Sequence, residues 1–296
     1  MPTFGASIYS ISRKIISGEM SPADGIKWLA DNGAEAIELV PFGIDMVNEP
    51  VLIDTLLEAA KKANVPIINY SLNANFLQIT TEEYAAELSR VKTHIDIANK
   101  LNLPTIRIDC AGYRRPIETN TIENFQQELP MILDTYRTLC DYASRYHITV
   151  LLENHGFHIN GADRIRQIMT SIDRPNFGHQ LDTGNYECVD DRAESAVDRL
   201  LPFATTIHVK DFYIRTRDPG DATQFDCSGS WFRSSGGRFL RGSILGQGDL
   251  DIYRILNSIK KSGYSGHILV EFEGMEDCLY GTRVSLDNLK RIYQSI

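Results

Sequence analysis

The chain has 296 residues, of which 39 are acidic and 30 are basic, so its formal net charge at pH 7 is −9. It is 43% hydrophobic and 23% charged, which is ordinary globular composition and excludes disordered, collagen-like and coiled-coil chains. Proteins that bind nucleic acids or anionic membranes usually carry a basic surplus, so we expect neither partner here.

Eight short apolar segments along the chain predict β-strands. They are rich in Ile, Val and Leu and are bounded by Gly, Pro, Asn or Asp, which is typical of buried parallel strands. The expected strands cover residues 4–9, 35–40, 65–72, 103–109, 148–154, 176–182, 205–211 and 267–273.

Stretches with the apolar spacing of helices separate these strands. Ser21 and Pro22 are suited to begin a helix that ends at residues 32–33, and the spacing of Thr80 and Glu83 predicts a capping box before a helix over 81–102. Another helix ends at residues 262–263, before the eighth strand. Pro130 lies inside the apolar pattern of 125–143, which predicts either a kink or a later helix start.

Eight strand–helix units in series, with no low-complexity linker, predict a single (β/α)8 TIM barrel over residues 1–296. An open doubly wound sheet is the main alternative. Such a sheet would more often carry GxGxxG after its first strand, and the sequence has no such motif.

One long segment, at about residues 213–247, shows no helical pattern and is rich in Gly, Ser, Arg and aromatic residues. Segments of this length without secondary structure are usually functional loops, so we expect an active-site loop. Trp231, Phe232 and Phe239 favour a packed lid over a disordered insertion.

The remaining composition predicts a reduced, cytoplasmic protein. The five cysteines are scattered without a CxxC pair, so neither a disulfide framework nor a structural zinc site is expected. Neither a signal peptide nor a window close to 18 apolar residues is visible. The oligomeric state stays open, with a homo-oligomer as one option.

Candidate metal ligands stand at the ends of four consecutive expected strands: Glu153, Asp182, His208 and Glu271. Barrel enzymes place their chemistry at this end of the strands. Each residue alone has an ordinary structural explanation, such as capping a turn, but together they would repel or stay unsatisfied without a cation. Three carboxylates and one imidazole favour one Mn²⁺ or Mg²⁺ ion, with Mn²⁺ preferred and Co²⁺ or Zn²⁺ left open.

Four segments of the chain resemble the xylose isomerase-like superfamily of sugar-phosphate isomerases and epimerases. They are LLENHG (151–156), LDTGN (181–185), HVKD (208–211) and VEFEG (270–274), and the similarity spans nearly the whole chain. The resemblance implies a TIM barrel in which Glu153, Asp182, His208 and Glu271 hold one divalent metal. Glu38, in AIELV, also matches the family and is expected to contact substrate.

The sequence departs from the ketose 3-epimerases of this group. Asn185 stands where they usually carry a histidine, and Ile159 stands where they carry a second glutamate. His155 lies two residues beyond Glu153 instead. Glu273 shares strand parity with Glu271 and is an alternative ligand. The natural substrate therefore stays open.

The leading hypothesis is a metal-dependent sugar or polyol isomerase or epimerase that works through an enediolate. The metal would polarise a carbonyl, and Glu153 and Glu271 would remove and return a proton. Lys210, which shares parity with His208, and Asn185 are expected to bind the substrate, a small carbohydrate.

Three alternatives remain. The first is a metal-dependent lyase or dehydratase acting on 3-keto-glycosides or inososes, with His155 as the catalytic base. A nuclease of the endonuclease IV type would need more histidine ligands and a basic face, so it ranks far lower. A non-catalytic sugar-binding protein also ranks low, because the glutamate pair is present.

Overall fold

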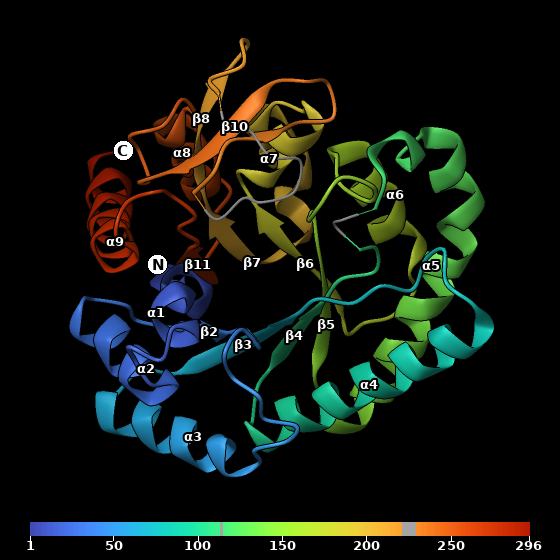
Figure 1. Ribbon diagram of the computed structural model, residues 1–296, viewed down its shortest axis with the longest axis horizontal. Helices are drawn as coiled ribbons and strands as arrows, with labels where there is room; N and C mark the ends of the chain where they lie inside the picture. The colour runs from blue at the N-terminus through green and yellow to red at the C-terminus, as the bar shows by residue number, and fades with distance from the viewer. Residues whose placement is uncertain (113–114, 221–228) are drawn as a thin grey trace.

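The expected (β/α)8 barrel is confirmed in the computed structural model, which describes residues 1–112, 115–220 and 229–296. Eight parallel strands close in the order β1-β11-β7-β6-β5-β4-β3-β2 (Figure 1). Their bounds are β1 (Thr3–Ser7), β2 (Ile37–Leu39), β3 (Ile67–Leu72), β4 (Thr105–Ile108), β5 (Thr149–Glu153), β6 (Phe177–Asp182), β7 (Ala204–Val209) and β11 (His267–Val270). Because the strands are parallel, all their carboxyl ends open at one mouth.

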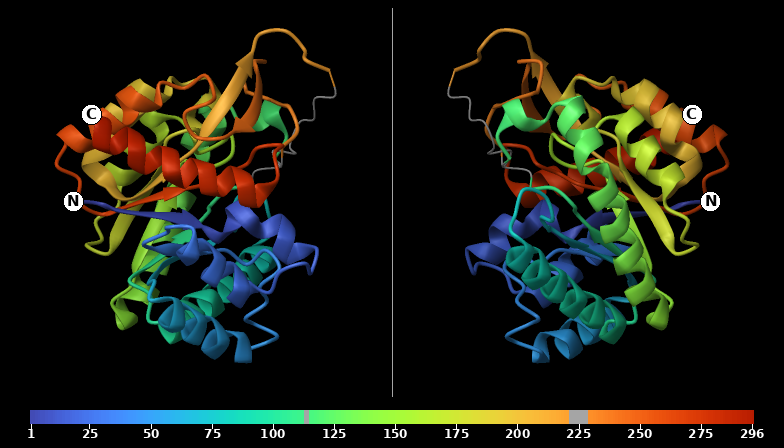
Figure 2. Two further views of the ribbon diagram at one scale, coloured as in Figure 1. Left: turned by 90° about the vertical axis from the view of Figure 1, so that its left-hand side faces the viewer. Right: turned by 90° about the vertical axis from the view of Figure 1, so that its right-hand side faces the viewer.

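Helices cover the outside of the barrel (Figures 1 and 2). They are α1 (Ser12–Ile16), α2 (Pro22–Asp31), α3 (Val51–Ala63), α4 (Thr81–Lys100), α5 (Ile122–Ala143), α6 (Ala162–Ser171), α7 (Ala193–Leu200), α8 (Ile252–Lys261) and α9 (Cys278–Ser295). Ser21 caps α2, and Thr80 and Glu83 form the expected capping box of α4. The inner faces of the helices and the outer faces of the strands form most of one large apolar core.

Helix α5 begins before Pro130, whereas one of the two alternatives drawn from the sequence was a later helix start. Thr121 accepts a hydrogen bond from the backbone N–H of Asn124, so the helix begins at Ile122 and continues through Pro130. A later helix start is therefore wrong. Pro130 has no N–H to donate to the carbonyl of Gln126, but both residues are exposed, so water can bind that carbonyl.

The segment expected to lack secondary structure contributes a small antiparallel sheet. Its strands are β8 (Asp211–Arg215), β9 (Phe232–Arg233) and β10 (Phe239–Ser243), in the order β8-β10-β9. The expectation of an irregular segment was wrong for these strands, and residues 221–228 of it lie outside the described part. In Figure 1 this sheet lies beside α7 and α8, beyond the ends of the barrel strands.

Two neighbouring aromatic residues at β9, Trp231 and Phe232, have different surroundings. Phe232 is buried and packs against Phe212, with ring centroids 5.8 Å apart. Trp231 is only half-buried and stacks with the Arg241 guanidinium, 4.9 Å from the ring centroid. Phe232 therefore packs against β8 of the same sheet, within the large apolar core, whereas Trp231 belongs to a cation–π contact.

A close backbone contact joins the sheet to the mouth. Gly242 in β10 pairs with Gly274, just after β11, and a Cβ at Gly242 would lie 2.3 Å from the carbonyl oxygen of Glu273. Only glycine permits this approach. The sheet is thus fastened to the segment that follows Glu271.

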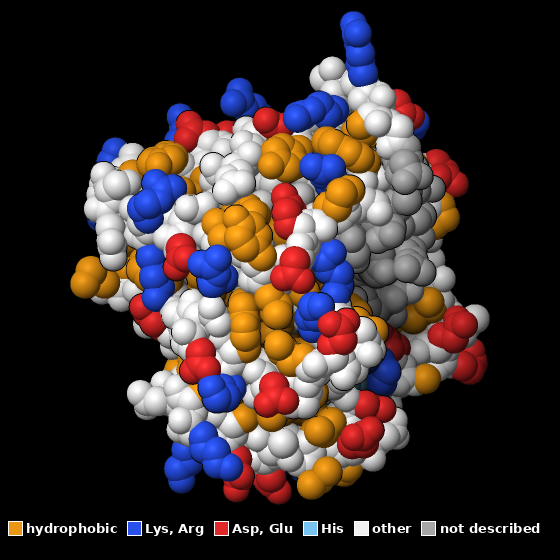
Figure 3. Space-filling view, turned by 60° about the vertical axis from the view of Figure 1, so that its left-hand side comes forward, with side chains coloured by type: hydrophobic (Ala, Val, Ile, Leu, Met, Phe, Trp, Pro, Cys, Tyr) orange, Lys and Arg blue, Asp and Glu red, His pale blue; other side chains and the backbone are white. Residues whose placement is uncertain are grey.

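The surface carries both charge signs. On the face drawn in Figure 3, Lys and Arg side chains alternate with Asp and Glu side chains and with small apolar patches. Among the helices of the described residues, none combines the length and apolar character that crossing a membrane requires.

Candidate metal centre

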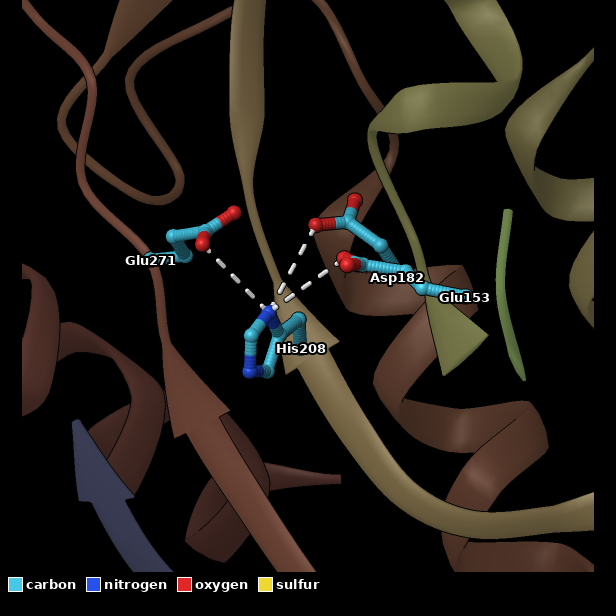
Figure 4. A group of neighbouring side chains, drawn as sticks. All are labelled: Glu153, Asp182, His208 and Glu271. Atoms are coloured by element: carbon cyan, nitrogen blue, oxygen red, sulfur yellow. Dashed lines mark ion pairs between the residues drawn. The ribbon is translucent and has the colours of Figure 1, made fainter. Parts of the chain in front are cut away.

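The four residues expected to bind a metal lie together at the mouth. Glu153 ends β5, Asp182 ends β6, His208 lies in β7, and Glu271 directly follows β11. Each offers one ligand atom, and these four atoms all lie within 4.8 Å of one another. Figure 4 shows the three carboxylates converging on one nitrogen of His208.

The distances around His208 are similar on all sides. Its Nδ1 lies 3.6 Å from Glu153 Oε1, 3.6 Å from Glu271 Oε1 and 3.9 Å from Asp182 Oδ2. All four side chains are at least nine-tenths buried. Such a group of polar atoms is costly to bury unless another partner completes it.

Asp182 is held in a fixed orientation by its own turn. Its Oδ1 accepts hydrogen bonds from the backbone N–H groups of Gly184 at 2.8 Å and Asn185 at 2.9 Å. The side chain of Asn154, directly after β5, also fixes the Asp182 backbone. Its Oδ1 accepts a hydrogen bond from the N–H of Asp182, and its Nδ2 donates one to the Asp182 carbonyl. The second carboxylate oxygen, Oδ2, is therefore directed at the cluster.

Two buried cations hold the outer oxygens of the glutamates. Arg107 Nε lies 2.9 Å from Glu153 Oε2, and Lys210 Nζ lies 2.6 Å from Glu271 Oε2. Lys210 also contacts Asp182 Oδ2 at 3.4 Å and Glu273 Oε1 at 3.3 Å. Glu273, the alternative ligand, thus contacts Lys210 and is not one of the four clustered groups.

The pKa values of the two glutamates are shifted in opposite directions. Burial raises the pKa of Glu153 to about 7, against the opposing charge of Arg107. Burial also opposes the ionisation of Glu271, but Lys210 and His208 hold its pKa well below the usual value. Glu271, the glutamate that contacts Lys210, therefore has the lower pKa of the two.

His155 and Asp109 form a second group beside the first. His155 Nδ1 lies 2.8 Å from Asp109 Oδ2, and Arg107 Nη1 lies 2.8 Å from Asp109 Oδ1. Burial disfavours the charged form of His155, but the Asp109 carboxylate outweighs it and raises the pKa of His155 to about 9. Asp109, Glu153 and His155 each offer one possible ligand atom, and these three atoms lie within 4.8 Å of one another.

The residues expected to bind substrate occupy different places. Asn185 is buried beside the cluster and accepts a hydrogen bond from Lys210 Nζ at 3.1 Å. Glu38 lies deeper, fully buried in the barrel, where its Oε2 is 3.1 Å from His208 Nε2. Glu38 therefore contacts the imidazole at Nε2, whereas the three ligand carboxylates face Nδ1.

The donor set fits a divalent cation. Among the described residues, neither His208 Nδ1 nor Asp182 Oδ2 has a hydrogen-bond partner, although both atoms are buried and face each other. Carboxylate oxygens with one imidazole nitrogen are suitable ligands for Mn²⁺, Mg²⁺ or Zn²⁺. Glu153, Asp182, His208 and Glu271 would hold the ion.

A family model described as xylose isomerase-like TIM barrel matches residues 26–293. The chain belongs to this family. No curated protein sequence matches it at a significant level. The resemblance read from the four sequence segments is thereby confirmed at the level of the family.

Solved structures of xylose isomerase-like barrels resemble the chain along its length. The IOLI protein with a bound zinc atom has a TM-score of 0.74 and 14% identity, covering 99% of this chain and 98% of that one. The probable 3-DHS dehydratase AsbF of Bacillus anthracis has a TM-score of 0.71 and 17% identity, covering 98% and 99%. The 3-keto-D-glucoside 4-epimerase of E. coli has a TM-score of 0.69 and 15% identity, covering 98% and 100%. At these identities the likeness shows a shared fold.

Sequence reasoning missed three members of the site. Arg107 and Asp109 lie in and just after β4, with the same strand parity, and Asn69 lies in β3. Arg107 and Asp109 are two positions apart at the end of the fourth expected strand, so both side chains point to the same face of the sheet. This spacing was the signal that could have identified them. Asn69 carried no signal, since a single amide in a strand is common.

Proposed function

We propose that the protein is a metal-dependent sugar or polyol isomerase or epimerase. The observation that carries this proposal is the pair Glu153 and Glu271, which approach His208 Nδ1 from the non-adjacent strands β5 and β11 at 3.6 Å each. Membership of the xylose isomerase-like family and the likeness to an epimerase structure support an enzyme of this class.

The two glutamates would act as the proton-transfer pair. A bound divalent cation, with Mn²⁺ preferred, would polarise a substrate carbonyl and acidify the neighbouring C–H. One glutamate would take the proton from one side of that carbon, and the other would return a proton from the opposite side. Arg107 and Lys210 fix the outer oxygens of the pair, so the inner oxygens face the cluster, where the metal and the substrate carbonyl would lie.

Lys210 and Asn185 would bind the oxygens of a small carbohydrate. Asn185 Nδ2 is buried and has no hydrogen-bond partner among the described residues, so a donor is available next to Lys210. Two adjacent donors suit a hydroxyl or carbonyl oxygen. The described parts of segment 213–247 would cover this mouth within a single barrel domain, and the contact between Gly242 and Gly274 supports that position.

A second candidate is a lyase or dehydratase acting on 3-keto-glycosides or inososes. The contact between His155 and Asp109 favours it, because a carboxylate at Nδ1 orients an imidazole for acid–base work. The likeness to a dehydratase structure agrees with this candidate. In this reaction the neutral form of His155, which is the minor form at pH 7 because its pKa is about 9, would remove the proton, and the leaving group would depart from the next carbon.

Turnover in D₂O tests the proposal. Mn²⁺-loaded protein is incubated with a panel of ketoses, an inosose and a 3-keto-glycoside, and the products are analysed by NMR and mass spectrometry. An isomerase or epimerase leaves deuterium at the exchanged carbon of a sugar of unchanged composition. A lyase releases the aglycone or water and leaves an unsaturated product.

Three variants assign the base. Glu153→Gln and Glu271→Gln keep an oxygen ligand and should each lower exchange by about 10²–10⁴-fold, the usual contribution of a positioned base. His155→Ala should retain exchange. If His155→Ala alone loses activity, the lyase candidate replaces the isomerase. No deuterium and no product with any substrate would favour a sugar-binding protein.

A further inference from the structure

The carboxylate of Glu38 is buried in the centre of the barrel, where the strand pattern would suggest an apolar side chain. Glu38 is the middle residue of β2, and His208 lies in β7 on another side of the closed sheet. Both side chains have no exposed surface. A buried carboxylate is costly unless its oxygens are bonded, so its partners indicate its role.

One partner is the nitrogen of His208 that faces away from the cluster. Glu38 Oε2 lies 3.1 Å from His208 Nε2, whereas Nδ1 faces Glu153, Asp182 and Glu271. Figure 4 shows the other ring nitrogen pointing away from those three carboxylates. A proton held on Nε2 by Glu38 leaves the lone pair of Nδ1 directed at the cluster, which is the tautomer that a metal ligand needs.

The other partner fixes the carboxylate itself. Asn69 Nδ2 donates to Glu38 Oε2 at 2.7 Å and to Gln180 Oε1 at 2.7 Å, while Asn69 Oδ1 accepts from the Thr105 hydroxyl at 2.8 Å. Glu38, Gln180 and Thr105 lie on β2, β6 and β4, so neighbours on three strands determine the orientation of the Asn69 amide. Glu38 is therefore held by the barrel wall.

We infer that Glu38 is a positioning residue for His208, in place of the substrate contact expected from the sequence. It sets the tautomer and ring orientation of the imidazole and thereby the affinity of the cluster for a divalent cation. Outer partners of this kind typically change metal affinity by about 10–100-fold. The inference rests on the proposed metal site and adds a residue that touches neither the ion nor the substrate.

Metal affinity measured without substrate tests it. Mn²⁺ is titrated into chelator-treated wild type, Glu38→Gln and Glu187→Gln by calorimetry. Glu187 is the matched control, because its carboxylate is likewise buried and bonded to a side-chain nitrogen, that of Arg238 at 2.8 Å, but does not contact the four ligands. We expect Kd to rise about 10–100-fold in Glu38→Gln and to stay unchanged in Glu187→Gln.

Asn69→Ala provides a second variant should Glu38→Gln fail to fold. It keeps the carboxylate but removes the amide that orients it, and we expect Kd to rise several-fold. Nitrogen NMR of the Zn²⁺-loaded protein gives an independent readout, because with the ion on Nδ1 the proton of wild-type His208 should lie on Nε2.

Three outcomes would overturn the inference. An unchanged Kd in Glu38→Gln, or in Asn69→Ala where that variant decides, removes the positioning role and leaves the metal site intact. A normal Kd combined with a higher KM would return Glu38 to substrate contact. Failure of the wild type to bind any divalent cation would overturn both this inference and the proposed function.

Discussion

Replacing Lys210 with methionine should destabilise the protein more when no metal is bound than when Mn²⁺ is bound. Lys210 Nζ is buried and contacts Asp182, Glu271 and Glu273 within 3.4 Å. Methionine keeps the aliphatic stem but leaves these carboxylates without their cation. Removing one partner of a buried ion pair usually costs about 3–5 kcal/mol of unfolding free energy.

This free energy corresponds to a measurable shift in melting temperature. Unfolding entropy is about 2.1 cal/mol/K per residue, so a chain of 296 residues gives roughly 0.6 kcal/mol/K. A loss of about 4 kcal/mol should therefore lower Tm by about 6 °C. With saturating Mn²⁺ the difference between variant and wild type should shrink, because an ion among the same carboxylates supplies positive charge.

Calorimetry with chelator and with excess Mn²⁺ measures both differences. Arg115→Met is the matched control, because Arg115 forms a buried ion pair with Glu128 at 2.8 Å, outside the cluster. Its loss in Tm should be the same with and without Mn²⁺. The reasoning is refuted if the Lys210→Met deficit is equally large in both conditions, since the metal would then bind elsewhere.

Three further predictions concern metal binding, the antiparallel sheet and acid stability. Asp182→Asn and His208→Ala should each lose bound metal by elemental analysis, and full stoichiometry in both would refute the ligand assignment. Asp190→Ala removes the acceptor of Arg238 Nε at 2.6 Å, so it should speed limited proteolysis of segment 213–247 several-fold without changing the Kd for Mn²⁺. Burial lowers the pKa of His94 from 6.5 to about 4, so stability present above pH 6.5 is lost as the pH falls toward 4. At pH 5 this loss is about 2 kcal/mol, and urea unfolding of His94→Gln should lack that part of the pH dependence.

The four clustered ligands were predictable from the sequence for a geometric reason. Once eight strands were recognised, their carboxyl ends had to meet at one mouth, so polar residues at four consecutive strand ends had to be neighbours. The strand ends were accurate to a few residues: β5 and β6 end at Glu153 and Asp182 as expected, while β11 ends just before Glu271. The four ligand side chains therefore lie close together even though the expected strand ends differ from the observed ones by a few residues.

The role of Glu38 could not be derived in the same way. Its contact with His208 crosses the interior of the barrel, between residues 170 positions apart in the chain, and depends on side-chain direction. The small antiparallel sheet was missed for a different reason. In β8, Phe212 and Ile214 alternate with Tyr213 and Arg215, and the Gly- and Ser-rich residues around them hid this short pattern.

The spacing of the cluster supports a metal ion over a proton as its missing partner. In this part of the described structure, two buried permanent cations, Arg107 and Lys210, lie among six carboxylates. The side chains of these carboxylates are at most 9% exposed, and they are Glu38, Asp109, Glu153, Asp182, Glu271 and Glu273. A proton on His208 Nδ1 would reduce the excess charge, but the oxygens lie 3.6–3.9 Å away, beyond the usual N–H···O range of about 2.7–3.2 Å. Atoms that share one ion at about 2.0–2.2 Å are separated by roughly 3–4 Å. The observed spacing therefore supports the proposed cation between the groups, with Glu38 holding the imidazole in the form that can bind it, as we infer.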